Sequence, residues 1–95
     1  MQDETFEWDD TKAATNRREH GVSFHDAIKA FRDRFAVERF DDREGYGEER
    51  INLLGMCEGV PLHVTYTERG DRIRIISARR AARHEQDNSY RENPR

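Results

Sequence analysis

The stretch YTERGDRIRIISARRAAR, residues 66–83, decides the fold because it holds a hairpin followed by the start of a helix. Strands are predicted at residues 62–67 and 72–79, because apolar and polar side chains alternate over 62–67 and 72–75, which is typical of strands with one buried face. The residues between these strands, with Gly70, predict a tight hairpin loop. Beyond the second strand the sequence favours a helix to about residue 87.

Six arginines lie in this stretch, against two acidic residues. On a regular strand, Arg72, Arg74 and Arg80 fall on one face, whereas Ile73 and Ile75 fall on the other. Guanidinium groups bind phosphate through two parallel hydrogen bonds, which an ammonium group cannot do. The hairpin therefore predicts a sheet that buries one face and offers phosphate-binding side chains on the other.

Two helices are predicted before this hairpin. Asp9 or Asp10 caps the first helix, and Gly21 stops it. Ser23 caps the second, which ends near Asp33 and has apolar residues at helical spacing, so that one stripe is buried.

Two further strands are expected at residues 35–40 and 50–56, with an acidic, glycine-bearing loop between them. The element order predicts an α+β fold with two N-terminal helices, a four-stranded antiparallel sheet and a C-terminal helix. Both N-terminal helices are expected to cover one face of the sheet. Residues 1–95 are expected to form a single domain, with a loose tail from about residue 88.

The composition argues for a polar, cytoplasmic protein. Charged residues make up 39% of the chain, and no apolar run resembles a signal peptide or a membrane span. The single cysteine, Cys57, fits a reducing compartment. The four histidines have no metal-binding spacing, so we expect neither a metal nor a cofactor.

Polar side chains in the predicted sheet suggest chemistry on RNA. Thr65 and Thr67 are expected beside Arg74 and Arg72, respectively, across the hairpin, and Arg50 extends this patch. Metal-free RNA cleavage needs a base for the 2′-hydroxyl, cations for the phosphoryl oxygens and an acid for the leaving oxygen. The chain holds side chains of each type.

Several motifs resemble the BrnT-type toxins. They are FEWDDTKAATNRREHGVSF at residues 6–24, GEER at 47–50, YTERGDRIRIISARRA at 66–81 and the ending at 85–90. The resemblance implies a RelE-like fold and a ribonuclease toxin of a type II toxin–antitoxin pair that halts translation. It also implies a BrnA-type antitoxin with a ribbon-helix-helix domain, and a complex that represses its own operon and contacts operator DNA only through the antitoxin.

Site residues are carried over from the resemblance one position at a time. The expected catalytic centre of a metal-independent endoribonuclease is Glu49, Arg50, Arg74 and Arg79. The expected RNA-binding residues are Lys12, His20, Thr65, Tyr66, Thr67, Arg72 and Arg80.

The net charge supports an alternative. RelE-like toxins are usually strongly basic, whereas this chain carries a net charge of −3. The alternative hypothesis is a catalytically weak relative that binds the antitoxin and acts mainly in repression of transcription. Intact GEER and RIISARR motifs favour the ribonuclease, and the acidic balance favours the binding module.

Overall fold

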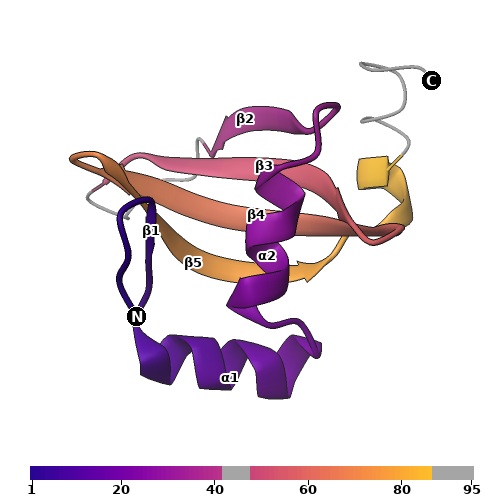
Figure 1. Cartoon of the computed structure of the whole chain (residues 1–95). Coiled ribbons are helices and arrows are strands. Elements are labelled where there is room, and N and C mark those ends of the chain that lie inside the picture. The colour runs from indigo at the N-terminus through magenta and orange to yellow at the C-terminus, as the bar shows by residue number, and fades with distance from the viewer. Residues whose placement is uncertain (42–47, 87–95) are drawn as a thin grey trace.

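The computed structural model describes residues 1–41 and 48–86. A five-stranded sheet with the strand order β1-β5-β4-β3-β2 forms its centre (Figure 1). The strands are β1 (Phe6–Glu7), β2 (Val37–Asp41), β3 (Arg50–Cys57), β4 (Val60–Arg69) and β5 (Arg72–Arg80). Strands β2 to β5 form the expected antiparallel meander, and β1 pairs parallel to β5.

Both N-terminal helices form where the sequence predicted them. Asp9 caps α1 (Asp10–His20) by accepting a hydrogen bond from the Lys12 N–H, and Gly21 ends it in the left-handed region at φ +70°. Ser23 caps α2 (Phe24–Phe31) through a bond from the Asp26 N–H at 3.0 Å. The caps satisfy backbone N–H groups that have no partner within the helix.

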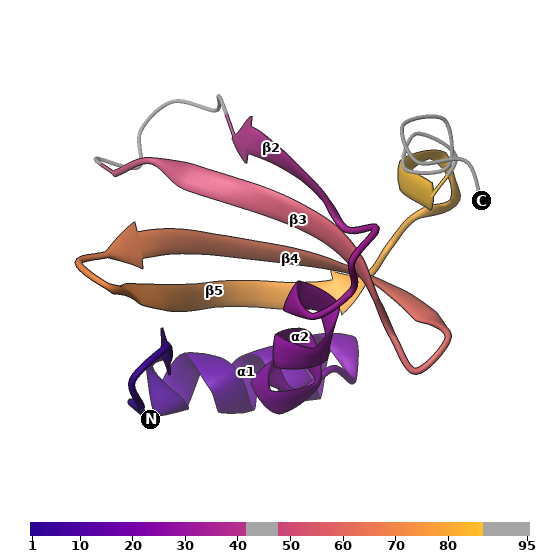
Figure 2. The ribbon, with the colours of Figure 1, turned by 45° about the horizontal axis from the view of Figure 1, so that its top comes forward.

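The hydrophobic core lies between α2 and one face of the sheet, the helix-bearing face (Figure 2). Phe24, Val64 and Ile75 are its largest fully buried side chains. Helix α2 approaches β3 closely at Gly55, where a Cβ atom would lie 2.5 Å from the carbonyl oxygen of Ala30. Glycine at this position therefore allows the helix to sit on the sheet.

The expectation that both helices cover one face was wrong, because α1 instead lies along the β5 edge (Figures 1 and 2). The buried Asn16 side chain binds the edge of β5 there. Its Nδ2 donates to the Ala78 carbonyl at 2.7 Å, and its Oδ1 accepts from the Ala78 N–H at 3.1 Å. Nδ2 also donates to the Val22 carbonyl at 3.0 Å. Asn16 thus pairs with β5 as a neighbouring strand would.

A purely antiparallel, four-stranded sheet was also wrong. Phe6 pairs with Ile73, and Glu7 pairs with Arg74, in a parallel arrangement. Two residues are too few to show the alternation of a strand, and their partners lie 67 residues further along the chain. The face of the sheet opposite α2 is crossed by neither α1 nor α2, and we call it the uncovered face.

The hairpin register differs from the expected one in two ways. Strand β4 continues to Arg69, so Thr67 pairs with Arg74 rather than with Arg72. A bulge then shifts the register between Thr65 and Tyr66, which moves Arg79 to the face that carries Arg74. The predicted position of Arg80 on that face was wrong, because Arg80 pairs with Leu62 and belongs to the helix-bearing face.

After β5 the described chain ends in a short helical turn at residues 83–86. The predicted helix extended to about residue 87, and the tail was expected from residue 88, so these ends lie outside the described residues. Within residues 1–41 and 48–86, no helix has the length and apolar character needed to span a membrane.

Candidate nucleic-acid interface

A row of polar side chains crosses the middle of the uncovered face. Asn52 pairs in register with Thr65, and Thr65 pairs with Ser77. The Thr65 hydroxyl donates to Asn52 Oδ1 at 2.8 Å. Arg39 continues the row on β2. Thr65 is buried, whereas Ser77, Asn52 and Arg39 are partly or fully exposed and offer hydroxyl, amide and guanidinium groups, all of which bind phosphate or sugar oxygens.

A second row contains an arginine held by the N-terminal segment. Arg74 pairs in register with Thr67 on one side and with Glu7 on the other. Its Nη1 donates to Glu7 Oε2 at 2.7 Å. Arg72, two residues earlier, donates from Nε to the Asp3 carbonyl at 2.7 Å. Two predicted phosphate-binding arginines are therefore positioned by contacts with the start of the chain.

A third row ends in a compact charged cluster. His63 pairs with Arg79, whose Nη1 and Nη2 donate to the two carboxylate oxygens of Glu85 at 2.8 and 2.9 Å. His63 Nε2 lies 3.5 Å from Glu85 Oε2. The bonds from Arg79, together with one from the Ala82 N–H, lower the pKa of Glu85 to about 2 in spite of its partial burial. Glu85 is thus ionised at neutral pH and is a poor proton acceptor.

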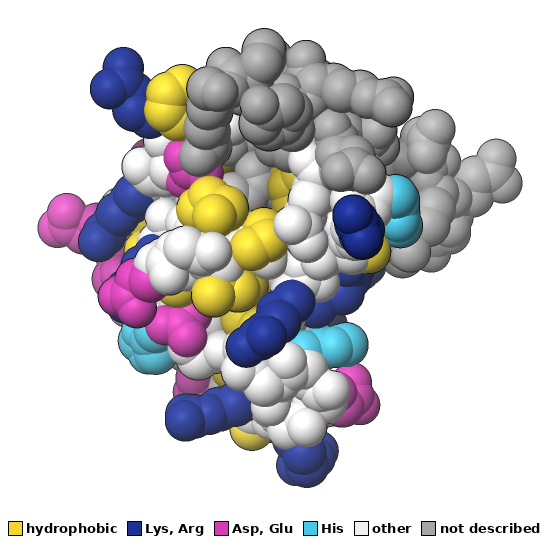
Figure 3. Space-filling view, turned by 90° about the vertical axis from the view of Figure 1, so that its right-hand side faces the viewer, with side chains coloured by type: hydrophobic (Ala, Val, Ile, Leu, Met, Phe, Trp, Pro, Cys, Tyr) yellow, Lys and Arg dark blue, Asp and Glu magenta, His cyan; other side chains and the backbone are white. Residues whose placement is uncertain are grey.

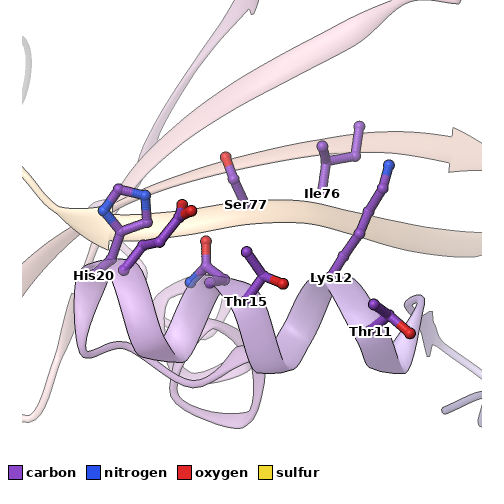
Figure 4. A pocket seen from close by; sticks show the side chains of 8 residues that line it. Thr11, Lys12, Thr15, His20, Ile76 and Ser77 are labelled. Atoms are coloured by element: carbon purple, nitrogen blue, oxygen red, sulfur yellow. The ribbon is translucent and has the colours of Figure 1, made fainter.

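A hollow of about 240 Å³ adjoins the middle row between α1 and β5. Figure 4 shows Lys12 and His20 rising from α1 at its two ends, with Ile76 and Ser77 on β5 opposite them. Thr15 lies between them on the helix. Ser77 belongs to both the hollow and the middle row, so the two surfaces are continuous.

Most of the predicted site residues share this region. The uncovered face and its hollow bring together Lys12, His20, Arg50, Thr65, Thr67, Arg72, Arg74 and Arg79. Arg50 is assigned to this face because side chains alternate along β3 and its neighbour Ile51 packs against the core.

Three predicted site residues lie elsewhere. Glu49 lines a hollow with Phe40 at an end of the helix-bearing face. Tyr66 is buried in the core, where its hydroxyl donates to Glu38 at 2.7 Å, and burial raises its pKa above the ordinary value. Arg80 lies on the helix-bearing face, as its register shows. Tyr66 and Arg80 are therefore separate from the rows described above. Glu49 touches the second row only through its backbone, because its carbonyl accepts a hydrogen bond from Thr67 Oγ1 at 2.6 Å.

The basic side chains do not form a single broad patch on the side of the molecule seen in Figure 3. Lysine and arginine side chains are scattered there, with hydrophobic and acidic side chains between them. Charge on the uncovered face is also balanced, since Arg74 and Arg79 each contact a glutamate. Within the described parts of the chain, no group of three or more potential ligands is placed to hold a metal ion.

Sequence reasoning missed three residues at this interface. Glu7 was missed because only the parallel β1–β5 pairing brings it to Arg74. Ser77 was missed because a regular strand places it on the face of Ile73 and Ile75, whereas the bulge places it in the middle row. Glu85 had a signal, because it begins the last segment that resembles the BrnT toxins.

Comparison with known families supports the resemblance seen in the motifs. A family model described as ribonuclease toxin, BrnT, of type II toxin-antitoxin system matches residues 8–85, which is most of the chain. A comparison with curated proteins finds no match. A type II toxin of this description has RNA as its substrate and an antitoxin as its partner. The chain belongs to the BrnT family of ribonuclease toxins of type II toxin–antitoxin systems.

Proposed function

We propose that the chain is a metal-independent endoribonuclease that cleaves RNA on the uncovered face and thereby inhibits translation. The observation that carries the proposal is the placement of Arg74 and Arg79 on one face of β5 with Ser77 between them. Two positioned guanidiniums bind a phosphodiester and stabilise the charge that grows on its oxygens during cleavage. The middle row of polar side chains and the hollow beside α1 supply contacts for the flanking nucleotides.

The proposed reaction uses the RNA 2′-hydroxyl as the nucleophile. Its oxygen forms a bond to phosphorus while the bond to the 5′-oxygen breaks, leaving a 2′,3′-cyclic phosphate and a 5′-hydroxyl. Arg50, Arg74 and Arg79 are the proposed catalytic cations. His63 lies beside Arg79, and an imidazole is the commonest group for proton transfer. We assign it the proton that the 2′-hydroxyl loses and that the leaving 5′-oxygen takes up. Glu49 lies in the hollow on the helix-bearing side and receives no role here.

The proposed partner is a BrnA-type antitoxin with a ribbon-helix-helix domain, which neutralises the toxin. The complex represses its own operon and reaches operator DNA only through the antitoxin. The family supports an antitoxin partner, and the motifs support its BrnA type.

The test is RNA cleavage by the purified chain in the presence of EDTA, beside growth after induced expression. Arg74→Ala should lower the cleavage rate by about 10²–10³-fold, the usual effect of removing one positioned donor. Arg83→Ala is the matched control, because Arg83 is exposed on the turn beyond β5 and loses the same charge. Products with 3′-hydroxyl ends, loss of activity in EDTA, or equal effects of the two variants would contradict the proposal.

The two ion pairs on the uncovered face favour a second candidate, the antitoxin-binding module. Glu7 and Glu85 already contact the guanidiniums of Arg74 and Arg79, so phosphate must compete with a carboxylate for each of them. Glu7→Gln removes one competitor without changing the arginines. If the chain is a ribonuclease, this variant should bind RNA more tightly. A soluble native chain that permits normal growth and cleaves no RNA would favour the binding module.

A further inference from the structure

The two edges of the sheet differ in what pairs with their outer strands. On the β5 edge, β1 pairs with Ile73 and Arg74, and Asn16 binds the backbone of Ala78. On the opposite edge, β2 is the outer strand, and within residues 1–41 and 48–86 no strand pairs with its far side. An exposed strand edge presents N–H and C=O groups that bind another extended chain.

An exposed aromatic ring marks the β2 edge. Phe40 is 70% exposed, the most of any large hydrophobic residue that the structure describes. It pairs in register with Ile51, whose side chain packs against the core. Phe40 and Ile51 line a hollow of about 370 Å³ together with Glu49 and Glu68. The ring therefore extends the apolar surface of the core to the rim of the sheet.

The lining of this hollow is acidic. Glu48, Glu49 and Glu68 line it, and among the residues that the structure describes no lysine or arginine does. Arg69 Nη2 lies 3.7 Å from Glu48 Oε2, and Glu49 and Glu68 add further negative charge to the lining. Such a surface repels phosphate, so it suits a basic polypeptide and not RNA.

We propose that β2 and this acidic hollow bind an extended segment of the antitoxin in which an apolar residue is followed, two or four residues along the chain, by lysine or arginine; the identity of the partner rests on the proposed function. The segment adds a sixth strand beside β2, places an apolar side chain on Phe40 and directs basic side chains to the glutamates. A spacing of two or four residues suits both demands, because successive residues of a strand point to opposite faces and every second residue points to the same one. Phe40 and Ile51 place this surface on the helix-bearing side. Thr67 of the uncovered face also lines the hollow but is only 3% exposed, so the segment leaves the uncovered face to RNA.

The test measures binding of overlapping peptides that cover the antitoxin encoded beside the toxin. One peptide with this spacing of apolar and basic residues should bind the full-length native chain. Phe40→Lys should weaken its affinity at least about 10-fold, since buried aromatic anchors dominate interfaces of this kind. Glu48→Lys combined with Glu68→Lys should also weaken binding and remove the slowing of association by salt. Glu4→Lys, an exposed charge change at the opposite edge, should leave binding unchanged.

Further readouts separate this proposal from its rivals. Backbone amides of β2 should become protected from hydrogen exchange when the peptide binds, and the peptide should not displace RNA. Equal affinity of the native chain and both variants overturns the proposal, as does competition with RNA. A dimer of the chain that Phe40→Lys dissociates also overturns it, because the edge then serves a second copy. Binding is measured without cleavage, so an inactive chain leaves this test intact while contradicting the proposed function.

Discussion

The two faces of the sheet are made from alternate residues of the same strands, yet they differ in what holds them. On the helix-bearing face, Val64 and Ile75 are buried among apolar side chains. On the uncovered face, Arg74 and Arg79 are held by carboxylates. One step along β5, from Arg74 to Ile75, therefore passes from a residue proposed for chemistry to a residue needed for stability. Variants at neighbouring positions should separate the two roles.

Ile75→Asp should have the largest effect. Ile75 is 1% exposed, so the new carboxylate would be buried without a partner. An uncompensated buried charge costs several kcal/mol, a large part of the roughly 5–15 kcal/mol that stabilises a typical domain. We expect loss of the cooperative thermal transition by circular dichroism. The double variant Arg74→Ala with Glu7→Gln, which removes an ion pair on the other face, should still melt cooperatively. If both proteins melt alike, the distinction between the faces fails.

Asn16→Ala should have the next largest effect. It would show that a polar residue can be needed for stability, as Ile75 is. The variant leaves the N–H and C=O of Ala78 without their side-chain partner at a buried edge. Each unsatisfied buried group costs about 1–3 kcal/mol. Denaturant unfolding measures the loss, with Thr11→Ala on the exposed surface of α1 as the control. A loss below about 0.5 kcal/mol would indicate that water replaces the amide.

Acid should have the smallest effect and should act on the uncovered face. The pKa of Glu85 is lowered from 4.5 to about 2, so its ionised form is favoured by folding. The stabilisation is complete above about pH 4.5 and is lost as the pH falls towards 2. We expect about 1 kcal/mol or less, because the Arg79 side chain is 38% exposed and solvent screens the pair.

The measurement is the difference in unfolding free energy between the native chain and Glu85→Gln as a function of pH. Other carboxylates with lowered pKa values, such as Asp3 and Asp9, titrate in both proteins and cancel in this difference. The difference should shrink as the pH falls from about 4.5 towards 2. A difference that stays constant over that range would mean that the Arg79–Glu85 contact does not persist in solution.

Local signals were enough to predict much of the fold. The cap at Ser23, the αL stop at Gly21 and the alternation in β4 each depend on residues close in sequence, and each was confirmed. Long-range contacts could not be predicted in this way. Two residues of β1 gave no periodicity, and Asn16 looked like an ordinary helix residue until Ala78 was placed beside it.

The candidate site was predicted less well for a different reason. A single bulge between Thr65 and Tyr66 exchanges the faces of Arg79 and Arg80. The prediction continued a regular alternation through the adjacent Ile75 and Ile76, where the sequence pattern breaks. Glu49 and Arg50 are adjacent, so a strand necessarily separates their side chains. A sequence motif made of adjacent residues therefore predicts where a site lies better than it predicts which of those residues belong to the site.

The position of β5 in the sheet has a consequence for how the chain folds during its synthesis. Strand β5 is the last strand to be made, yet it lies between β1 and β4. During synthesis, α2 and strands β2 to β4 can associate before β5, the strand with which β1 pairs, has been made. Arg74 meets Glu7 across 67 residues of sequence, and closing so long a loop comes late in folding. A nascent chain therefore forms the β1–β5 pairing and the contact between Arg74 and Glu7 only after β5 has been translated.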